Sequence, residues 1–211
     1  MARGRFITFE GGEGVGKSTQ IQRLVARLQT GGREVVSTRE PGGSPGAEMI
    51  RDLVLRGAAD RWSPVTETLL MYAARRDHIE RVIRPALARG AWVVCDRYAD
   101  STRAYQGAAG GADPGLISAM ETYVLEEVRP DLTLIFDLAP DVGVGRAIDR
   151  AGAELRFESK GDAFHQRLRE AFLGIAAAEP ERCALIDASG SIEAVGQAVW
   201  AQVELRLAVH G

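Results

Sequence analysis

The stretch Gly11-Gly12-Glu13-Gly14-Val15-Gly16-Lys17-Ser18 follows a short apolar run and precedes a segment with helical periodicity. It matches the pattern G-x-x-x-x-G-K-[ST] in the context of strand, glycine-rich loop and helix start that this pattern requires. Glycines let consecutive backbone N–H groups converge on a phosphate, and the N-terminus of the following helix adds positive potential. We therefore interpret the stretch, extended by Thr19, as a P-loop that binds a nucleoside triphosphate.

Two side chains of this loop have specific expected roles. Lys17 would bridge the β- and γ-phosphates, and the Ser18 hydroxyl would ligate Mg²⁺. The chain contains only two lysines, Lys17 and Lys160, among 26 basic residues. A glycine-rich turn made only for packing would not require one of them at this position, so the lysine favours phosphate binding.

The composition excludes several classes of protein. The 211 residues are 45% hydrophobic and 26% charged, which is typical of one folded domain. The formal net charge of −3 provides no basic field, so neither nucleic acid nor an anionic membrane is an expected partner. Cys95 and Cys183 lie too far apart in sequence to suggest a zinc site or a disulfide framework. With no signal-peptide pattern and no apolar run of about 18 residues, we expect a cytoplasmic protein.

Short apolar runs alternate with longer stretches of helical character, which predicts βαβ units and a three-layer α/β fold with a parallel sheet. The five predicted strands are Arg5–Glu10, Glu34–Thr38, Trp92–Asp96, Leu132–Leu138 and Cys183–Asp187. The predicted helices are Lys17–Thr30, Glu48–Arg56, Pro64–Arg89, Pro114–Val128, Asp141–Arg150, Asp162–Ala178 and Ile192–Leu207. Pro85 lies inside the third helix and predicts a kink or an early stop there.

Two stretches, Ser101–Asp113 and Ala151–Gly161, are polar or rich in glycine and lack apolar periodicity. We interpret both as loops. On an α/β scaffold, loops of this kind commonly carry the functional residues.

A P-loop does not identify the reaction, because ATPases, GTPases and kinases share it. In an open parallel sheet, ligands bind outside the carboxyl ends of the strands. Thr38–Gly43 (TREPGG) follows the second predicted strand, Asp96–Tyr98 follows the third, and Leu69–Arg75 lies on the helix before it. We expect these segments to share one crevice with the P-loop.

With these segments the chain resembles thymidylate kinase, the P-loop enzyme that transfers a phosphoryl group from ATP to dTMP. The matching motifs are GGEGVGKST, TREPGGS, LLMYAAR, DRYADSTRAYQG and the arginine-rich segment after the fourth strand, in the order and spacing of the family from about residue 5 to residue 190. The resemblance implies a P-loop NTPase fold of the nucleoside monophosphate kinase type, built as one domain over residues 1–211. It also implies Mg²⁺ as cofactor, ATP and dTMP as substrates, and a homodimer.

The resemblance assigns catalytic roles around the P-loop. Asp96, at the end of a strand, would hold Mg²⁺ together with Ser18 and orient the acceptor. Arg97 would bind the acceptor phosphate or the migrating phosphoryl group, because a planar guanidinium matches phosphate oxygens in a bidentate way. Lys17 would bind the triphosphate, and Glu13 would face the 3′-hydroxyl of the acceptor sugar.

Position 14 is a glycine, whereas one branch of the family has an arginine there. The resemblance is therefore to the other branch, in which a lid supplies the catalytic cation. We expect this lid at about residues 146–161, with Arg156 as the first choice for the catalytic arginine and Arg150 as the second.

The family reads thymine with an arginine and a glutamine, which match Arg75 and Gln106 here. An arginine donor suits the O4 carbonyl of thymine and faces the amino group of cytosine badly. Many members stack the base on a phenylalanine at the position of Met71, so Met71 or the adjacent Tyr72 would replace it. The complete set of expected substrate-binding residues is Arg39, Glu40, Pro41, Arg51, Met71, Tyr72, Arg75, Arg97, Ser101, Thr102, Tyr105 and Gln106.

Two alternatives stay open at the level of sequence. A deoxynucleoside kinase on the same scaffold would need a carboxylate base for a neutral hydroxyl, and Glu40 or Glu13 could serve. A regulatory protein could bind nucleotide without catalysis. The intact set of Lys17, Ser18, Asp96 and Arg97 argues against this second alternative.

Overall fold

A five-stranded parallel sheet forms the centre of the computed structural model, which describes residues 3–58, 60–143 and 160–209. The strand order is β2-β3-β1-β4-β5. The strands are β1 (Phe6–Gly11), β2 (Val35–Arg39), β3 (Trp92–Asp96), β4 (Leu132–Asp137) and β5 (Cys183–Asp187). All five predicted strands are confirmed within one residue at each end, and so is the three-layer α/β prediction.

The central strand β1 pairs in parallel with β3 on one side and β4 on the other. All six of its residues are buried, as expected for a strand that helices cover on both faces. The register places Phe9 opposite Asp96 and Gly11 opposite Phe136. The P-loop, the end of β3 and the end of β4 therefore meet at one edge of the sheet.

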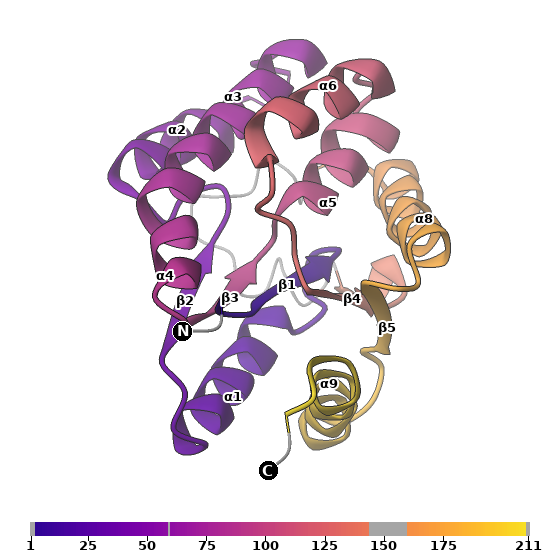
Figure 1. The fold of residues 1–211 in the computed structure, drawn as a ribbon. Coiled ribbons are helices and arrows are strands. Elements are labelled where there is room, and N and C mark those ends of the chain that lie inside the picture. The colour runs from indigo at the N-terminus through magenta and orange to yellow at the C-terminus, as the bar shows by residue number, and fades with distance from the viewer. Residues whose placement is uncertain (1–2, 59, 144–159, 210–211) are drawn as a thin grey trace.

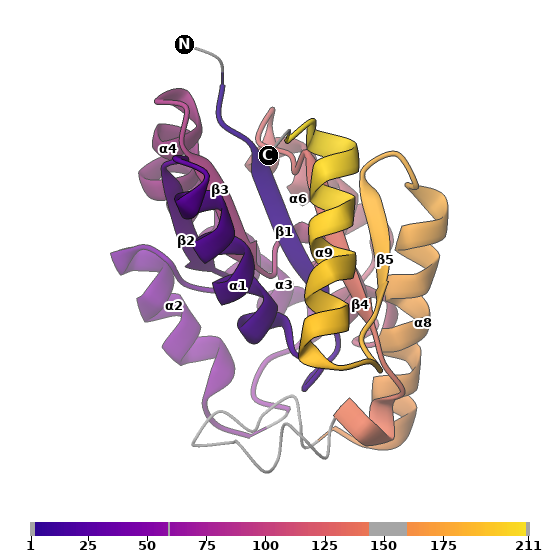
Figure 2. The same cartoon turned by 90° about the horizontal axis from the view of Figure 1, so that it is seen from below.

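Helices cover both faces of the sheet (Figures 1 and 2). On one face, α1 (Lys17–Thr30) and α9 (Ile192–Leu207) pack against each other and bury an aliphatic cluster with Phe9 and Phe136. On the other face lie α3 (Pro64–His78), α4 (Arg84–Ala88), α6 (Pro114–Leu125) and α8 (Asp162–Ala178), while α2 (Pro45–Leu55) packs on α3. No described helix has the length and apolar character needed to cross a bilayer.

The long helix predicted over Pro64–Arg89 is divided into three parts. Helix α3 ends at His78, a π-helical turn η1 (Ile79–Ile83) follows, and α4 begins at Arg84. Pro85 has no backbone N–H to donate and its ring clashes with the preceding turn of a regular helix. The wider turn accommodates the proline, so the irregularity lies one turn before Pro85 rather than at it.

The prediction of a loop over Ser101–Asp113 is wrong for much of that segment. Helix α5 (Ala99–Thr102) leads into a π-helical turn η2 (Arg103–Ala108). Several polar side chains of this segment are buried and form hydrogen bonds with other elements. The segment therefore lacks the apolar periodicity that would predict a helix.

Helix α2 begins at Pro45, three residues before the predicted start, because a proline suits the first helical position. The helix predicted over Asp141–Arg150 and the loop over Ala151–Gly161 lie almost entirely outside the described residues.

Candidate active site

The lysine of the P-loop forms hydrogen bonds with the backbone of the same loop. Lys17 Nζ donates hydrogen bonds to the carbonyl oxygens of Gly12 at 2.8 Å and Gly11 at 3.2 Å. The side chain is buried, and burial together with the charge of Arg97 lowers the pKa of Lys17 to about 8. A bound triphosphate would favour the charged form again, so the loop presents a cation that is already placed for an anion.

The glycine at position 14 is required by close packing. Its φ is +66°, and a Cβ atom there would lie 1.8 Å from the carbonyl oxygen of Gly143. A side chain at this position therefore needs both a strained backbone and a shift of residue 143.

We expect Gly14→Ala to reduce the free energy of unfolding by about 1–3 kcal/mol, because alanine pays the cost of a left-handed backbone and clashes with Gly143. Thermal unfolding of the ligand-free protein measures this as a lower Tm. Gly12→Ala is the matched control, since nothing lies within 4 Å of a Cβ atom at that position. Equal Tm values for the two variants would contradict the packing argument.

A cavity of about 140 Å³, called the acceptor cavity below, lies beside the P-loop. It is lined by Glu13, Glu40, Pro41, Arg51, Leu55, Met71, Arg97, Ser101, Tyr105 and Gln106. These residues come from five separate segments, and all except Leu55 belong to the expected substrate-binding or catalytic set. The structure therefore brings eight of the twelve expected substrate-binding residues together, while Arg39, Tyr72, Arg75 and Thr102 lie outside the lining. Leu55 carries no polar group and ends an amphipathic helix, so sequence alone gave no signal for it.

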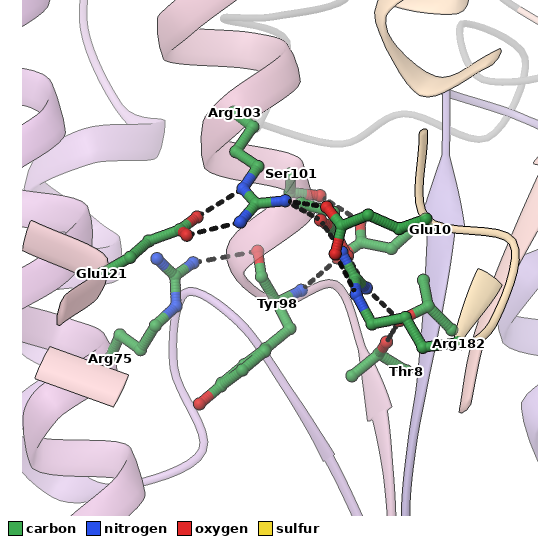
Figure 3. A network of polar contacts seen from close by, with 11 residues as sticks. Thr8, Glu10, Arg75, Tyr98, Ser101, Arg103, Glu121 and Arg182 are labelled. Atoms are coloured by element: carbon green, nitrogen blue, oxygen red, sulfur yellow. Dashed lines mark hydrogen bonds and ion pairs between the residues drawn. The ribbon is translucent and has the colours of Figure 1, made fainter. Parts of the chain in front are cut away.

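Arg75 is buried and is not among the residues that line this cavity, but it contacts the lining residue Glu40. Its Nε donates to Glu40 Oε2 at 2.7 Å, and Nη2 donates to the carbonyl oxygen of Tyr98 at 2.9 Å and to Thr102 Oγ1 at 3.1 Å. Figure 3 shows Arg75 reaching toward the Tyr98 backbone. Nη1 is the exception, because it is buried and has no hydrogen-bond partner in the described part of the chain.

Gln106 shows the complementary pattern. Its Nε2 donates to Glu67 Oε1 at 2.9 Å, while its Oε1 is buried without a partner among the described residues. Buried polar groups are nearly always satisfied, so an unused donor on Arg75 and an unused acceptor on Gln106 indicate a ligand that supplies both partners. Glu67 and His78, which contacts Glu40 at 2.9 Å, were missed by the sequence analysis.

Met71 and Tyr72 separate in the structure. Met71 lines the cavity, whereas Tyr72 is 1% exposed and belongs to the core cluster that also contains Phe6 and Val93. The Tyr72 ring packs against the Arg75 guanidinium at 4.9 Å. Of the two residues that could contact a base, Met71 has the placement for it. Thr102 is also fully buried, does not line the cavity, and accepts a hydrogen bond from Arg75.

Arg97 lines the acceptor cavity and its side chain reaches the P-loop. Its Nη1 donates to the Gly11 carbonyl oxygen at 2.9 Å and to Ser101 Oγ at 3.2 Å, and its Nη2 donates to Glu13 Oε1 at 2.9 Å. Tyr105 also donates its hydroxyl to Glu13 Oε1, at 2.5 Å. Burial alone would raise the pKa of Glu13, but the charges of Arg97 and Lys17 hold it below its usual value. The carboxylate is therefore ionised at neutral pH.

Asp96 and Ser18 meet at the mouth of the P-loop. Ser18 Oγ donates to Asp96 Oδ2 at 3.3 Å, and Asp96 Oδ1 is buried with no partner in the described ranges. Those ranges contain no cluster of three or more His, Cys, Asp or Glu side chains that could hold a metal. Mg²⁺ at nucleotide sites takes few protein ligands and fills its coordination with phosphates and water. One hydroxyl and one unsatisfied carboxylate oxygen fit that ion.

A second cavity, of about 520 Å³, lies between the P-loop and the segment after β5. It is lined by Gly14, Val15, Gly16, Thr19, Gln20, Ala188, Gly190, Ser191, Ile192 and Val195. The sequence analysis missed the segment between β5 and α9, although the rule that ligands bind beyond the carboxyl ends of parallel strands applies to β5 as well. This cavity has room for the nucleoside part of a triphosphate whose phosphates lie in the loop.

The remaining predicted residues have less direct evidence. Arg39 is exposed and pairs with Glu48 at 3.2 Å, outside the lining of the acceptor cavity. Arg150, Arg156 and the lid at about 146–161 lie outside the described residues, apart from the end of that segment.

A comparison with models of known families gives a match over residues 9–199 to thymidylate kinase. The chain belongs to the thymidylate kinase family. It is 64% identical to a thymidylate kinase of Caulobacter vibrioides over 98% of this chain and 99% of that relative. It is 54% identical to a thymidylate kinase of Bradyrhizobium diazoefficiens, over 97% of this chain and 91% of the relative.

A solved thymidylate kinase structure from Ehrlichia chaffeensis has the same fold. It superposes with a TM-score of 0.77 at 33% identity, over 95% of this chain and 99% of that one. The resemblance drawn from five motifs is thereby confirmed, as is the nucleoside monophosphate kinase type of the fold. We therefore assign roles to the residues of this site by comparison with the thymidylate kinase family.

Proposed function

We infer that the protein transfers the γ-phosphoryl group of ATP to dTMP and forms dTDP and ADP. Besides family membership, one observation carries this conclusion: Gln106, which lines the acceptor cavity, has an unused acceptor at Oε1, and Arg75, which pairs with the lining residue Glu40, has an unused donor at Nη1. Thymine offers an acceptor at O4 and a donor at N3–H. Cytosine offers a donor and an acceptor at the same two positions, so each would face a group of its own kind.

The chemistry suits an acceptor that is already ionised. The second pKa of a phosphate monoester is about 6, so dTMP needs alignment and charge neutralisation more than a general base. Lys17 binds the β- and γ-phosphates, and the P-loop backbone N–H groups hold them in place. Arg97 orients the acceptor phosphate toward the γ-phosphoryl group, and the carboxylate of Glu13 positions Arg97 and Tyr105 beside the sugar.

Ser18 and Asp96 are the residues that would hold Mg²⁺. When bound, the ion neutralises charge on the β- and γ-phosphate oxygens. The unsatisfied Oδ1 of Asp96 supports this assignment. Asp96 also stands next to Arg97, so one strand end supplies both a metal ligand and a phosphate ligand.

Three further features complete the proposal. The lid at about 146–161 closes over ATP and brings Arg156, or else Arg150, to the phosphates while excluding water. The chain acts as one cytoplasmic domain over 1–211 and forms a homodimer. The large apolar side chains exposed on α2 and α3 support dimer formation, because such groups commonly mark an interface; they are Met49, Leu53, Val65 and Leu69.

The charges of the site weigh against a deoxynucleoside kinase. Glu40 is buried and engaged by Arg75 and His78, so its carboxylate is not free to take a proton from a hydroxyl. Glu13 accepts from Arg97 and Tyr105, and its lowered pKa makes it a weak base. Neither carboxylate that such a reaction would need is suited to it.

The decisive test is ADP release from Mg-ATP by the purified protein, with one acceptor offered at a time. We expect rapid turnover with dTMP, slower turnover with dUMP, and kcat/KM at least about 100-fold lower with dCMP, because a site built for O4 and N3–H leaves its polar groups unpaired with cytosine. GMP and thymidine should give almost none. Turnover with thymidine but not dTMP would establish the nucleoside kinase, and ATP loss independent of the acceptor would overturn the proposal.

A further inference from the structure

Glu10 is a buried carboxylate that the proposed reaction does not yet use. It precedes the P-loop on β1, is 0% exposed, and uses both of its oxygens on the segment after β3. Oε1 accepts from the backbone N–H of Tyr98 at 2.7 Å, and Oε2 accepts from Ser101 Oγ at 2.6 Å. Figure 3 shows Glu10 facing these two residues.

The segment that Glu10 holds has a strained backbone. Arg97 has φ of +69°, a left-handed conformation that is uncommon for a residue other than glycine. Such a conformation persists only where the surroundings over-determine it, and it is concentrated at functional sites. Here the N–H of Arg97 donates to the Phe9 carbonyl oxygen at 2.9 Å, so β1 fixes the turn through Phe9 on one side of the strain and Glu10 on the other.

This turn decides where the Arg97 guanidinium points. From it the side chain crosses to Gly11 on the P-loop and to Glu13, and it lines the acceptor cavity. Ser101 links the two residues directly, because its hydroxyl donates to Glu10 and accepts from Arg97 Nη1. A shift of Tyr98 and Ser101 would therefore move the guanidinium.

The surroundings of Glu10 make its carboxylate costly to keep ionised. Burial and the carboxylate of Asp100 raise the pKa of Glu10 to about 7, while Ser101 and Arg97 act in the opposite direction. Lys17 also lies near enough to be influenced by its charge, and Asp100 itself is engaged by Arg182 at 2.7 and 2.9 Å. A buried carboxylate placed beside another carboxylate is costly to keep charged, which favours a functional reason for it.

We propose that Glu10 is a positioning residue for phosphoryl transfer, whose carboxylate fixes the left-handed turn at Arg97 through Tyr98 and Ser101 and so aims the guanidinium at the acceptor phosphate. The inference rests on the role proposed above for Arg97. Its consequence is that the effect of Glu10 on turnover passes through Arg97.

A double-mutant cycle on the full-length enzyme tests this. Glu10→Gln keeps the shape but turns an NH₂ group toward one of the two donors, so we expect kcat to fall about 30-fold, with KM for ATP changed less than about 3-fold. In an Arg97→Ala background the same substitution should lower kcat by less than about 3-fold, because the group that Glu10 positions is gone. When one residue acts only through another, the effects of the two substitutions on kcat are expected not to add.

Asp131→Asn is the matched control. Asp131 accepts from the backbone N–H of Phe6 at 2.7 Å, at the opposite end of β1, and should affect Tm without changing kcat. Should Glu10→Gln not fold, Glu10→Asp is carried through the same cycle, since its shorter side chain cannot reach both donors. Equal losses in both backgrounds, or a lower Tm with unchanged kcat, would overturn the inference alone. Wild-type kcat for Arg97→Ala would overturn the role of Arg97 and the inference with it.

Discussion

Lys17→Ala is expected to lower kcat by about 10²–10³-fold, the loss typical when a preorganised cationic donor is removed from a transition state. Lys17 is 7% exposed, and its ammonium is held by the carbonyl oxygens of Gly11 and Gly12 before any substrate binds. In such a site its charge acts on the phosphates with little screening by water. Charge on the γ-phosphoryl oxygens changes during transfer, so the loss should be larger in kcat than in ATP affinity.

Steady-state kinetics with dTMP, combined with an equilibrium titration of ATP, separates the two effects. Lys17→Arg should not restore turnover, because the planar guanidinium is larger than the ammonium that the loop encloses. Arg23→Ala is the control for general loss of charge, since Arg23 lies on the same helix but is exposed and pairs with Glu193 at 3.7 Å. A Lys17→Ala enzyme with a kcat within about 3-fold of wild type would remove the lysine from the mechanism.

Local patterns were sufficient to predict the elements of the sheet. Each strand is a short apolar run bounded by polar or glycine residues, and the segments that follow β1, β2 and β3 carry most of the site. The strand order could not be predicted, because it depends on pairs such as Phe9 with Asp96 that lie far apart in the chain. No local property of β1 indicates that β3 and β4 are its neighbours.

The side chains of the site divide in the same way. Lys17, Asp96 and Arg97 lie at strand ends or in the P-loop, where a pattern with a chemical reason identifies them. Glu10 and Glu67 act only as partners of other residues, in contacts between distant elements, and no spacing in the sequence announces them.

Met71 and Tyr72 show a related limit. Adjacent residues on a helix point about 100° apart, so only one of the two can face the cavity, and the register of α3 on the sheet selects Met71. That register is fixed by tertiary packing and not by the helix itself.

Arg75→Met is expected to damage stability and base recognition together. The Arg75 side chain is 1% exposed, packs between the rings of Tyr72 and Tyr98, and pairs with the buried carboxylate of Glu40. Removing one partner of a buried ion pair costs about 3–5 kcal/mol, because the other charge is left in a medium that solvates it poorly. For a chain of this size the Tm should fall by roughly 6–20 °C. Arg76→Met is the matched control, since the neighbouring arginine is partly exposed and its surface ion pairs contribute little.

A second substitution separates the two effects. Adding Glu40→Gln to Arg75→Met removes the buried charge that has lost its arginine, so the double variant should regain much of the lost Tm. It should not regain activity: kcat/KM for dTMP stays about 10²–10³-fold below wild type, and the preference for dTMP over dCMP falls to what Gln106 alone provides, because the donor for thymine O4 is still absent. Thermal unfolding and the acceptor assay measure the two quantities independently. If the stabilised double variant prefers dTMP over dCMP as strongly as wild type does, thymine is read by other groups, and the unpaired Nη1 of Arg75 has another purpose.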